Sequence, residues 1–535
     1  MGVTWTREQE QVINTRDRDI LVSAAAGSGK TAVLVARILA LITDADHPVD
    51  IDRLLVVTFT RAAAGEMRDR ISSAIEERLQ SDPENEHLQR QSVLLHNAKI
   101  STIHGFCTYV IQNYFFRTDL DPAYRIAEEG ELKEVRGTAV KELLEEEYQN
   151  AAPEFLAFTE TFAPGKNDQK LEEIIQRVSD YAMANPDPQA WLDACTNAVS
   201  AQTEEQLLET DWMQETLAEA ERILAGVRQA AEESRRIAAA SSGPAYFIPT
   251  AEADLEVVDA LAACSTYAEL QQAFAEMKFA TRARKKKTDA EPDPELVEQF
   301  IAGRKQLQKM LKDMKEKQFA DSIEEIIADL QKIRPMIGEL TRLAAAFEVR
   351  FSEKKRARNI VDFTDLEHYA LRILTEKRED GWHRTEVAKE LSEQFAEIMI
   401  DEYQDSNLLQ ETLLAAVSGE MEGRHNRFMV GDMKQSIYGF RMARPELFLE
   451  KYASYPPLEE TGDREPSPVS CRITLGKNFR SRPQVLDFAN AIFDKLMWKD
   501  LGGIRYDADA ALYRGALFLW PLKSEHRYRD RKSVV

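Results

Sequence analysis

The sequence predicts an α/β fold in which a parallel sheet domain is interrupted by a large helical insertion. Short apolar runs, each followed by a loop of distinctive composition, are predicted to be buried strands; they are residues 20–23, 54–59, 398–400 and 428–430. A helical pattern follows the first run, because its apolar residues share one helix face: Val33, Leu34, Ile38, Leu41 and Ile42. Strands that alternate with helices and carry distinctive loops at their carboxyl ends are typical of a parallel sheet.

The composition changes between about Glu131 and Arg350. This span is rich in Glu, Ala, Leu, Gln and Lys, and its apolar residues recur every three or four positions. It is predicted to be mostly helical and to interrupt the sheet domain, because strand-type motifs resume at Asp362 and Asp401. Its basic run at 282–287 precedes an acidic, proline-containing stretch, so an exposed loop is favoured over a nucleic-acid contact.

Overall composition limits the function classes. A chain of 535 residues is long enough for three or four domains. No long apolar run predicts a membrane span and no secretory signal is found, so a cytoplasmic protein is expected. The four cysteines form no CxxC pair, which argues against a disulfide framework, a zinc site or an iron–sulfur cluster. The net charge of −23 alone speaks against nucleic-acid binding, but a groove needs only local positive charge.

The segment from Ala24 to Thr31 lies between the first predicted strand and its helix. Small residues let the backbone wrap around a phosphate, whose oxygens then bind consecutive N–H groups and the helix N-terminus. Lys30 is expected to contact the β- and γ-phosphates, and the Thr31 hydroxyl to bind Mg²⁺. The predicted nucleotide-binding residues of this loop are Ala24, Ala25, Ala26, Gly27, Ser28, Gly29, Lys30 and Thr31, with alanine at the first position of the usual P-loop pattern.

Another apolar run ends in two carboxylates. Asp401 follows residues 398–400 directly and is placed to hold Mg²⁺ through water. Glu402 is then placed to orient and deprotonate the water that attacks a phosphate. Because two acids at a strand end are common, this motif predicts a nucleotide site only in combination with the P-loop.

Amide, aromatic and guanidinium groups crowd the segment 430–441. Gln435 is a candidate sensor of a γ-phosphate. Aromatic rings offer flat faces on which bases stack, at roughly 1–3 kcal/mol per base. The predicted nucleic-acid contacts of this segment are Tyr438, Phe440 and Arg441. An alternative stays open, in which Ile437, Tyr438 and Phe440 only pack in the core.

Two further segments, residues 58–68 and 101–107, combine hydroxyls, aromatic rings and basic side chains near a helix start. This combination can hold a sugar–phosphate backbone. The predicted contacts are Phe59, Thr60 and Arg61 in the first segment, and His104 and Phe106 in the second. For His104 alone, a structural histidine is the more common alternative.

Two weaker signals concern the nucleotide. Gln9 precedes the first strand, and its side-chain amide matches the edge of a purine. In the segment 475–481, Phe479 is placed to stack on adenine, and Arg480 to reach the γ-phosphate as an arginine finger.

The order and spacing of these segments resemble the superfamily 1 helicases of the UvrD type, over about residues 3 to 500. Within that group the chain is most similar to the AddA family, the helicase–nuclease subunits of bacterial AddAB enzymes. The likeness rests on the opening WTREQEQVI, the AAAGSGKT loop, the long helical insertion and VDFTDLEH before DEYQD. The resemblance assigns adenine contacts to Gln9 and Phe479, γ-phosphate contacts to Gln435 and Arg480, and the lining of the single strand to Phe59, Thr60, His104, Phe440 and Arg441.

The resemblance also implies a domain organisation and a function. A RecA-like domain 1A would comprise residues 1–120 and 355–445, a helical domain 1B residues 121–354, and the start of a second RecA-like domain 2A residues 446–522. The cofactors would be ATP and Mg²⁺. The enzyme would move 3′→5′ on single-stranded DNA and, with an AddB-like partner, process broken DNA ends for recombinational repair.

The sequence departs from the family pattern in several places. Arg61 and Ala62 replace a usual Asn-Lys pair, and the other replacements are Phe440 for Trp, Phe479 for Tyr and Met442 for Gly. No later helicase motif and no nuclease domain follows Arg480, and residues 523–535 are expected to be a truncated or frame-disrupted tail. We therefore expect nucleotide binding but little unwinding. The alternatives are a stand-alone UvrD-type repair helicase, a non-catalytic DNA-binding fragment, and a P-loop ATPase that acts on a protein or metabolite.

Overall fold

The chain folds into two compact units. The computed structural model describes residues 4–163, 165, 167–287, 290–378, 381–460, 469–496 and 513–514, so the predicted tail at 523–535 lies outside the described residues. The first unit comprises Met1–Val135, Met183–Pro188 and Ser352–Val535, and the second comprises Arg136–Ala182 and Gln189–Phe351. The second unit is thus inserted into the first along the sequence and overlaps most of the predicted insertion at 121–354.

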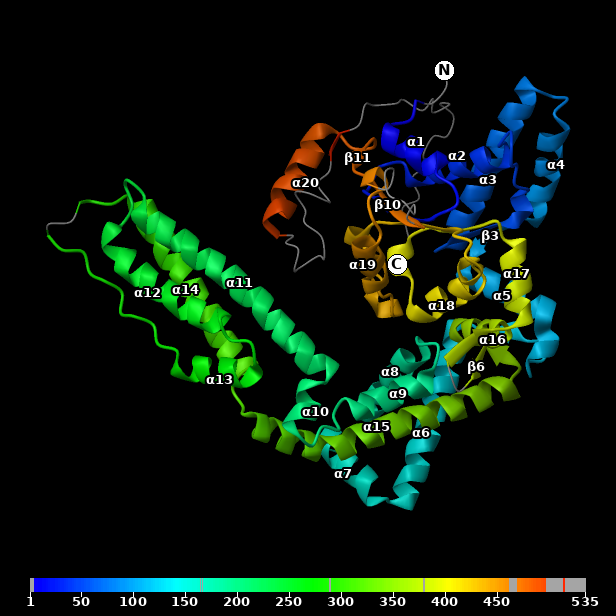
Figure 1. Cartoon of the computed structure of the whole chain (residues 1–535). Helices are drawn as coiled ribbons and strands as arrows, with labels where there is room; N and C mark the ends of the chain where they lie inside the picture. The colour runs from blue at the N-terminus through cyan, green and yellow to red at the C-terminus, as the bar shows by residue number, and fades with distance from the viewer. Residues whose placement is uncertain are drawn as a thin grey trace, which may run out of the picture. The chain divides into compact units, whose positions relative to one another are not determined.

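A six-stranded sheet forms the centre of the first unit (Figure 1). Every neighbouring pair of its strands is parallel. The strand order is β10 (Ser470–Leu475), β1 (Asp19–Ala24), β9 (Arg427–Gly431), β8 (Glu397–Ile400), β2 (Leu54–Thr58) and β3 (Lys99–Thr102). Strands β2, β8 and β9 are buried along their whole length, which explains their nearly continuous apolar runs in the sequence.

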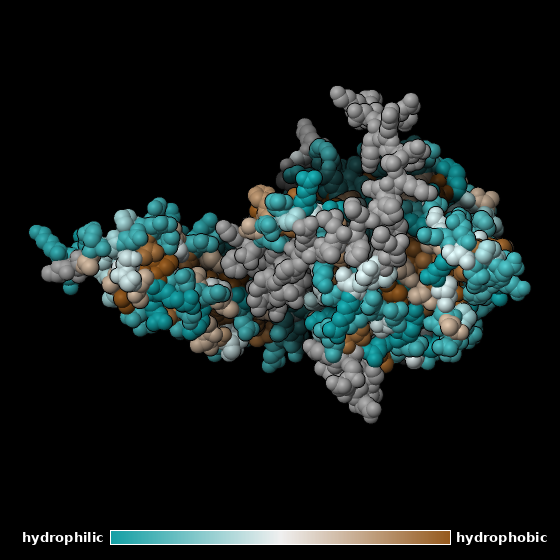
Figure 2. Space-filling view, turned by 90° about the horizontal axis from the view of Figure 1, so that it is seen from above, coloured by the Kyte–Doolittle hydropathy of each residue, from teal (hydrophilic) through white to brown (hydrophobic). Residues whose placement is uncertain are grey.

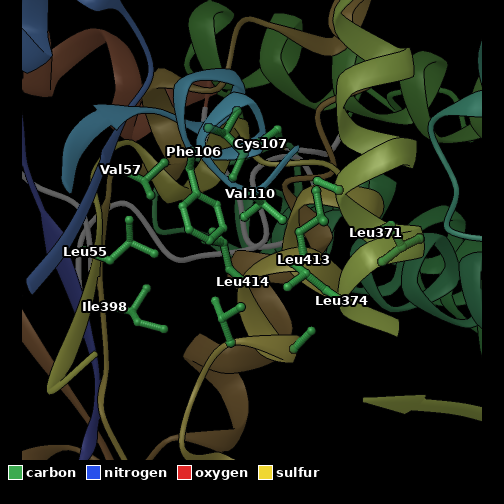
Figure 3. Close-up of a cluster of buried hydrophobic side chains, with 14 of the residues drawn as sticks. Leu55, Val57, Phe106, Cys107, Val110, Leu371, Leu374, Ile398, Leu413 and Leu414 are labelled. Carbon is green, nitrogen blue, oxygen red and sulfur yellow. The ribbon is translucent and has the colours of Figure 1, made fainter. Parts of the chain in front are cut away.

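Helices cover both faces of this sheet, because alternate side chains of each strand enter opposite cores. Leu55 and Val57 of β2 belong to one core, drawn in Figure 3, whereas Leu54 and Val56 belong to the other. The first core is completed by α5 (Ile103–Tyr114), α16 (Phe363–Leu374), α17 (Glu386–Gln394), α18 (Leu408–Ala416) and α19 (Glu446–Ser454). The second is completed by α1 (Arg7–Asn14), α2 (Lys30–Ile42) and α3 (Arg61–Ser81), and α4 (Glu86–Leu94) lies against α3.

Short elements complete the first unit. They are the parallel pair β4 (Arg125–Ile126) and β5 (Ile360–Val361), the hairpin β6 (Thr375–Arg378) and β7 (Gly381–Arg384), the parallel pair β11 (Lys477–Asn478) and β12 (Tyr513–Arg514), and helix α20 (Pro483–Leu496).

The predicted α/β fold with a parallel sheet is confirmed, but two of its strands were not predicted. Strand β3 reads KIST and β10 reads SCRITL, and neither is a continuous apolar run. The predicted boundary at residue 445 is wrong for β10. This strand pairs with β1 from Ser470 to Leu475 and buries Cys471, Ile473 and Leu475 in a core of the same sheet.

The described part of the second unit is helical. The helices are α6 (Glu129–Asn150) and α15 (Ile323–Ala357), which both extend into the first unit, together with α7 (Pro153–Phe162), α8 (Gln169–Met183), α9 (Pro188–Asn197), α10 (Glu204–Leu208), α11 (Asp211–Ala239), α12 (Ile248–Ala262), α13 (Tyr267–Glu276) and α14 (Pro294–Lys317). The largest core of this unit joins residues of α11, α12, α13 and α14. The basic run at 282–287 forms no helix or strand, and all its residues except Ala283 are exposed.

Hydrophilic residues predominate over the described part of the surface shown in Figure 2, with hydrophobic residues scattered among them. Within the described ranges, no helix is both long and apolar enough to cross a membrane. All four cysteines lie in described segments and are free thiols; Cys107 and Cys471 are buried.

Candidate nucleotide site and nucleic-acid interface

The loop between β1 and α2 has the conformation that phosphate binding requires. Gly27 and Gly29 have φ angles of +71° and +84°, a left-handed conformation that side chains strongly disfavour. Helix α2 begins at Lys30, and its N-cap, Gly29, has no side chain to occupy the first helical N–H groups. These groups and the positive end of the helix dipole therefore point toward the loop.

Three successive carbonyls of this loop are held by donors from other segments. Asn478 Nδ2 donates to the carbonyl of Ala26 at 2.6 Å, and the N–H of Phe479 donates to the carbonyl of Gly27 at 2.9 Å. Gln9 Nε2 donates to the carbonyl of Ser28 at 3.1 Å. Because a peptide's N–H points away from its C=O, these three bonds turn the following N–H groups away from the three donors, and that of Ser28 donates to the carbonyl of Ala25 at 3.1 Å.

Lys30 meets the acidic end of β8 across this loop. Lys30 Nζ lies 3.1 Å from Oε1 and 2.9 Å from Oε2 of Glu402, 372 residues further along the chain. Glu402 has a φ angle of +54°, and the N–H of Asp401 before it donates to the carbonyl of Val57 in β2. The parallel order of β1, β8 and β2 therefore brings the two predicted halves of the site together.

A pocket of about 270 Å³ opens beside this ion pair. Predicted residues from four segments meet in this pocket, together with Arg70, which was not predicted. The lining residues are Ala26, Gly27, Gly29, Lys30, Thr31, Ala32, Arg70, Glu402, Gln435 and Arg480. Arg70 lies on α3, where it pairs with Glu66. The predicted contacts Ala24 and Ala25 are buried at the end of β1 and do not line the pocket.

A second pocket, of about 260 Å³, adjoins the other side of the loop. It contains the predicted adenine contacts Gln9 and Phe479, and its lining residues are Thr6, Glu8, Gln9, Ser28, Thr474, Leu475, Gly476, Lys477 and Phe479. Gln9 also accepts the N–H of Thr6 at 3.0 Å, which closes a capping box on α1 and fixes its amide.

Asn478 was not singled out by the sequence analysis, although it lies in the segment 475–481. Besides holding Ala26, its Oδ1 accepts the N–H groups of Arg480 at 2.9 Å and Ser481 at 2.7 Å. Asn478 is 3% exposed, and a Cβ at Gly27 would approach its Nδ2 to 2.7 Å. One amide therefore fixes Arg480 relative to the phosphate-binding loop.

Two carboxylates near Glu402, those of Asp401 and Asp405, have raised pKa values. Burial and the charge of Glu402 raise the pKa of Asp401 to about 6, and Lys30 partly offsets this. Burial and Glu402 likewise raise the pKa of Asp405 to about 6. Among the described residues no three His, Cys, Asp or Glu side chains cluster as a metal site. Thr31 lines the nucleotide pocket, and Asp401 directly precedes Glu402, which lines it too.

A second group of side chains, named the aromatic cluster, consists of Phe59, Tyr438, Phe440 and Arg441. The ring centroids of Phe59 and Tyr438 are 4.4 Å apart, and those of Tyr438 and Phe440 are 5.7 Å apart. The guanidinium of Arg441 lies over all three rings, at 5.4 to 5.8 Å from their centroids. Phe440 and Ile437 are 73% and 71% exposed, so core packing, the alternative left open for them, is wrong.

The second predicted contact segment is only partly exposed. Phe106 is 1% exposed and points into the core shown in Figure 3, so its predicted contact with nucleic acid is wrong. It belongs to the buried face of α5, which packs against α16. His104 Nε2 lies 3.1 Å from Oε1 of the buried Glu367. The ring of Phe363, which the sequence analysis did not select, lies 4.6 Å from that of His104 and is 48% exposed.

Thr60 and Arg61 differ in their local roles. The Thr60 hydroxyl accepts the N–H of Ala63 at 3.1 Å and so caps α3, whereas Arg61 is exposed at the first position of that helix. An N-cap oxygen keeps its O–H free as a donor, so this role is compatible with a contact to phosphate.

A buried charge network supports the acidic end of β8. Glu411 accepts hydrogen bonds from Tyr403 Oη at 2.9 Å and from Arg427 Nη2 at 2.6 Å, and pairs with Lys451 at 3.1 Å. Burial alone would raise the pKa of Glu411, but Arg427 and Lys451 lower it to about 2. The hydrogen bond to Glu411 thereby fixes the position of Tyr403, the residue that follows Glu402.

We expect the Glu411→Gln variant to be less stable than the wild type near pH 7 by about 3 kcal/mol, since the pKa falls from 4.5 to about 2. A lowered pKa stabilises the fold above pH 4.5, and this contribution is lost as the pH falls toward 2. The difference between the two proteins should therefore shrink below pH 4.5. Urea unfolding between pH 7 and 3.5 measures it, with exposed Glu393→Gln as control. A constant difference across this range would contradict the assignment.

Comparisons with known proteins agree with the resemblance to UvrD-type helicases. The family model described as UvrD/REP helicase N-terminal domain matches residues 5–456. An ATP-dependent helicase/nuclease subunit of Lachnoclostridium phytofermentans is 43% identical over 520 residues, which are 96% of this chain and 37% of that protein. Proteins of the same name from Pelotomaculum thermopropionicum and Bacillus cytotoxicus are each 40% identical, over 96% and 97% of this chain and 40% and 41% of their own lengths. The chain thus spans about two fifths of the length of these curated relatives.

Proposed function

Because the chain belongs to the UvrD/REP helicase family, we propose that its first unit binds and hydrolyses ATP and couples hydrolysis to movement along single-stranded DNA. The observation that carries the proposal is the pairing of Lys30 Nζ with both carboxylate oxygens of Glu402, at 3.1 and 2.9 Å. A triphosphate between them would meet a phosphate-binding cation on one side and a general base on the other.

In the proposed reaction Lys30 turns from Glu402 to the β- and γ-phosphates, which leaves the carboxylate free to accept a proton from water. The water oxygen bonds to the γ-phosphorus as the bond to the β–γ bridging oxygen breaks, and ADP leaves. Magnesium held by Thr31 and Asp401 would neutralise charge on the phosphate oxygens. Gln435 and Arg480, which line the same pocket, would contact the γ-phosphate. Gln9 and Phe479 would hold the adenine in the second pocket.

Single-turnover hydrolysis of ATP, with and without a single-stranded oligonucleotide, tests this function. We expect hydrolysis that single-stranded DNA accelerates. Nucleotide binding without any hydrolysis would favour a non-catalytic DNA-binding fragment. Hydrolysis that DNA leaves unchanged would favour an ATPase that acts on a protein or metabolite.

We propose that the aromatic cluster and the pair His104 and Phe363 stack on the bases of the single strand, with Thr60 and Arg61 on its phosphates. The exposed rings of Phe440 and Phe363, at 73% and 48%, support this proposal, because stacking on an exposed ring tolerates any base sequence. The cation of Arg441 over three rings adds a charge that attracts phosphate.

Replacing Phe440 by alanine should weaken the binding of an oligo-dT strand about 5- to 150-fold, because stacking contributes roughly 1–3 kcal/mol per base. Phe363→Ala should act in the same direction. Fluorescence anisotropy at fixed salt measures both effects. Phe116→Ala is the matched control, since Phe116 is 65% exposed but lies outside the cluster. Equal losses for Phe440→Ala and Phe116→Ala would contradict the proposed interface.

We propose further that this chain supplies helicase motor segments to a longer enzyme like its relatives, which are named as ATP-dependent helicase/nuclease subunits. Such an enzyme would move 3′→5′, pair with an AddB-like subunit, and process DNA ends for recombinational repair in the cytoplasm. Identity of 39–43% over at least 96% of the chain supports this proposal over a stand-alone UvrD-type helicase. Co-purification of the full-length protein with an AddB-like subunit would test the partner.

A further inference from the structure

Gln404 bridges the two functional regions of the first unit. Its Nε2 donates to Glu402 Oε2 at 2.9 Å and lies 3.3 Å from Asp405 Oδ2. Its Oε1 accepts the N–H of Asp432 at 3.0 Å, at the end of β9. The side chain is 1% exposed, so no water competes for either end of the amide. The Gln404 amide therefore connects Glu402, the candidate catalytic base, to Asp432 at the end of β9.

Asp432 continues this connection toward the aromatic cluster. Its carboxylate accepts Gln435 Nε2 at 2.7 Å and the N–H of Lys434 at 3.1 Å, which fixes the turn η7 (Met433–Gln435). The next turn, η8 (Gly439–Arg441), carries Phe440 and Arg441. Gln404 thus holds the N–H of Asp432, the N-cap of a turn that ends at Gln435 in the nucleotide pocket and precedes the residues of the aromatic cluster.

The end of β9 is shaped to receive this amide. A Cβ at Gly431 would collide with Gln404 Oε1 and would lie 3.0 Å from the ring of Phe448. Gly431 is fully buried in the strand, so neither neighbour has open space into which to move. Only glycine at this position leaves room for Gln404 to reach the N–H of Asp432.

We propose that Gln404 is a positioning residue that couples nucleotide binding to the grip of the aromatic cluster on single-stranded nucleic acid. The proposal rests on the proposed function. When Lys30 leaves Glu402 for a phosphate, the Glu402 carboxylate changes its partners, and the amide bonded to it shifts the N–H of Asp432 and the turns that follow. Coupling of this kind is reciprocal and typically changes affinity about 5- to 150-fold.

The test measures the affinity of this chain for fluorescent oligo-dT with and without Mg²⁺ and a non-hydrolysable ATP analogue. The wild type should show a nucleotide-dependent change in affinity of at least fivefold. In Gln404→Met the ratio should fall to within twofold of one, while the affinity for each ligand alone changes less. Gln91→Met is the matched control, because Gln91 is also fully buried and both ends of its amide are bonded. Its Oε1 accepts the N–H of Ile51 and its Nε2 donates to Asp50 Oδ1, both at 2.8 Å. Neither partner lines the nucleotide pockets.

The outcomes separate this inference from the function on which it rests. A wild type that binds neither ligand contradicts the proposed function itself. A wild type whose two affinities are independent, or a Gln404→Met variant that keeps the wild-type ratio, overturns the role of Gln404. If Gln404→Met does not fold, Gln404→Asn decides the matter. It keeps a polar amide but is one methylene too short to reach Glu402 and Asp432 at once, so it should also lose the coupling.

Discussion

The Glu402→Gln variant should hydrolyse ATP about 10²- to 10⁴-fold more slowly than the wild type, which is the usual contribution of a general base. Glutamine has nearly the same shape as glutamate but accepts no proton from the attacking water. Its amide is still long enough to meet Gln404 and the phosphate-binding loop, so the pocket should keep its form. Single-turnover hydrolysis with single-stranded DNA present measures the effect.

Nucleotide binding should survive this substitution and become tighter. The charge of Glu402 raises the pKa of Asp401, so its removal leaves Asp401 more fully ionised and a better partner for Mg²⁺. It also removes a negative charge beside the triphosphate. Exposed Glu386→Gln serves as the control for the loss of one acidic side chain. A Glu402→Gln protein that hydrolyses ATP at the wild-type rate would exclude Glu402 as the base.

The main parts of the nucleotide site could be predicted from the sequence because parallel strands bring their carboxyl ends to one edge of a sheet. Lys30 follows β1 and Glu402 follows β8, so their meeting requires only that both strands join the same sheet. Apolar runs revealed β1, β2, β8 and β9. Strand β10 escaped because its alternating pattern is typical of a sheet edge, where only one face is buried.

Other parts of the site depend on tertiary contacts that no local pattern reports. Asn478 acts through a hydrogen bond to Ala26, 452 residues away, and Gln404 through one to Asp432, 28 residues away. An amide side chain has no sequence signature for such a role. Phe363 lies beside His104 because α16 begins there, a tertiary contact that its own sequence segment does not report. Phe106 was assigned wrongly because composition alone does not say which face of α5 is buried. Met442 has a φ angle of +59°, which explains why glycine is common at this position in similar helicases.

The Lys30→Met variant should bind ATP roughly 10- to 100-fold more weakly, since a hydrogen bond to a charged group contributes about 1.5–3 kcal/mol. Methionine keeps the aliphatic stem but has no charge for the β- and γ-phosphates. Two further effects add to the loss. Glu402 is left without its ion-pair partner and repels the triphosphate, and the pKa of Asp401 rises further, because the charge of Lys30 no longer lowers it.

Lys30→Met and Glu402→Gln should therefore separate the two halves of the site in opposite ways. A fluorescent ATP analogue with Mg²⁺ should bind weakly to the first variant and tightly to the second, although hydrolysis fails in both. Lys332→Met is the control, because Lys332 pairs with Asp329 on the exposed surface of the second unit. If Lys30→Met bound the analogue with wild-type affinity, the triphosphate would have to bind elsewhere. The ion pair between Lys30 and Glu402 would then be a structural contact, and the motor function proposed from it would lose its foundation.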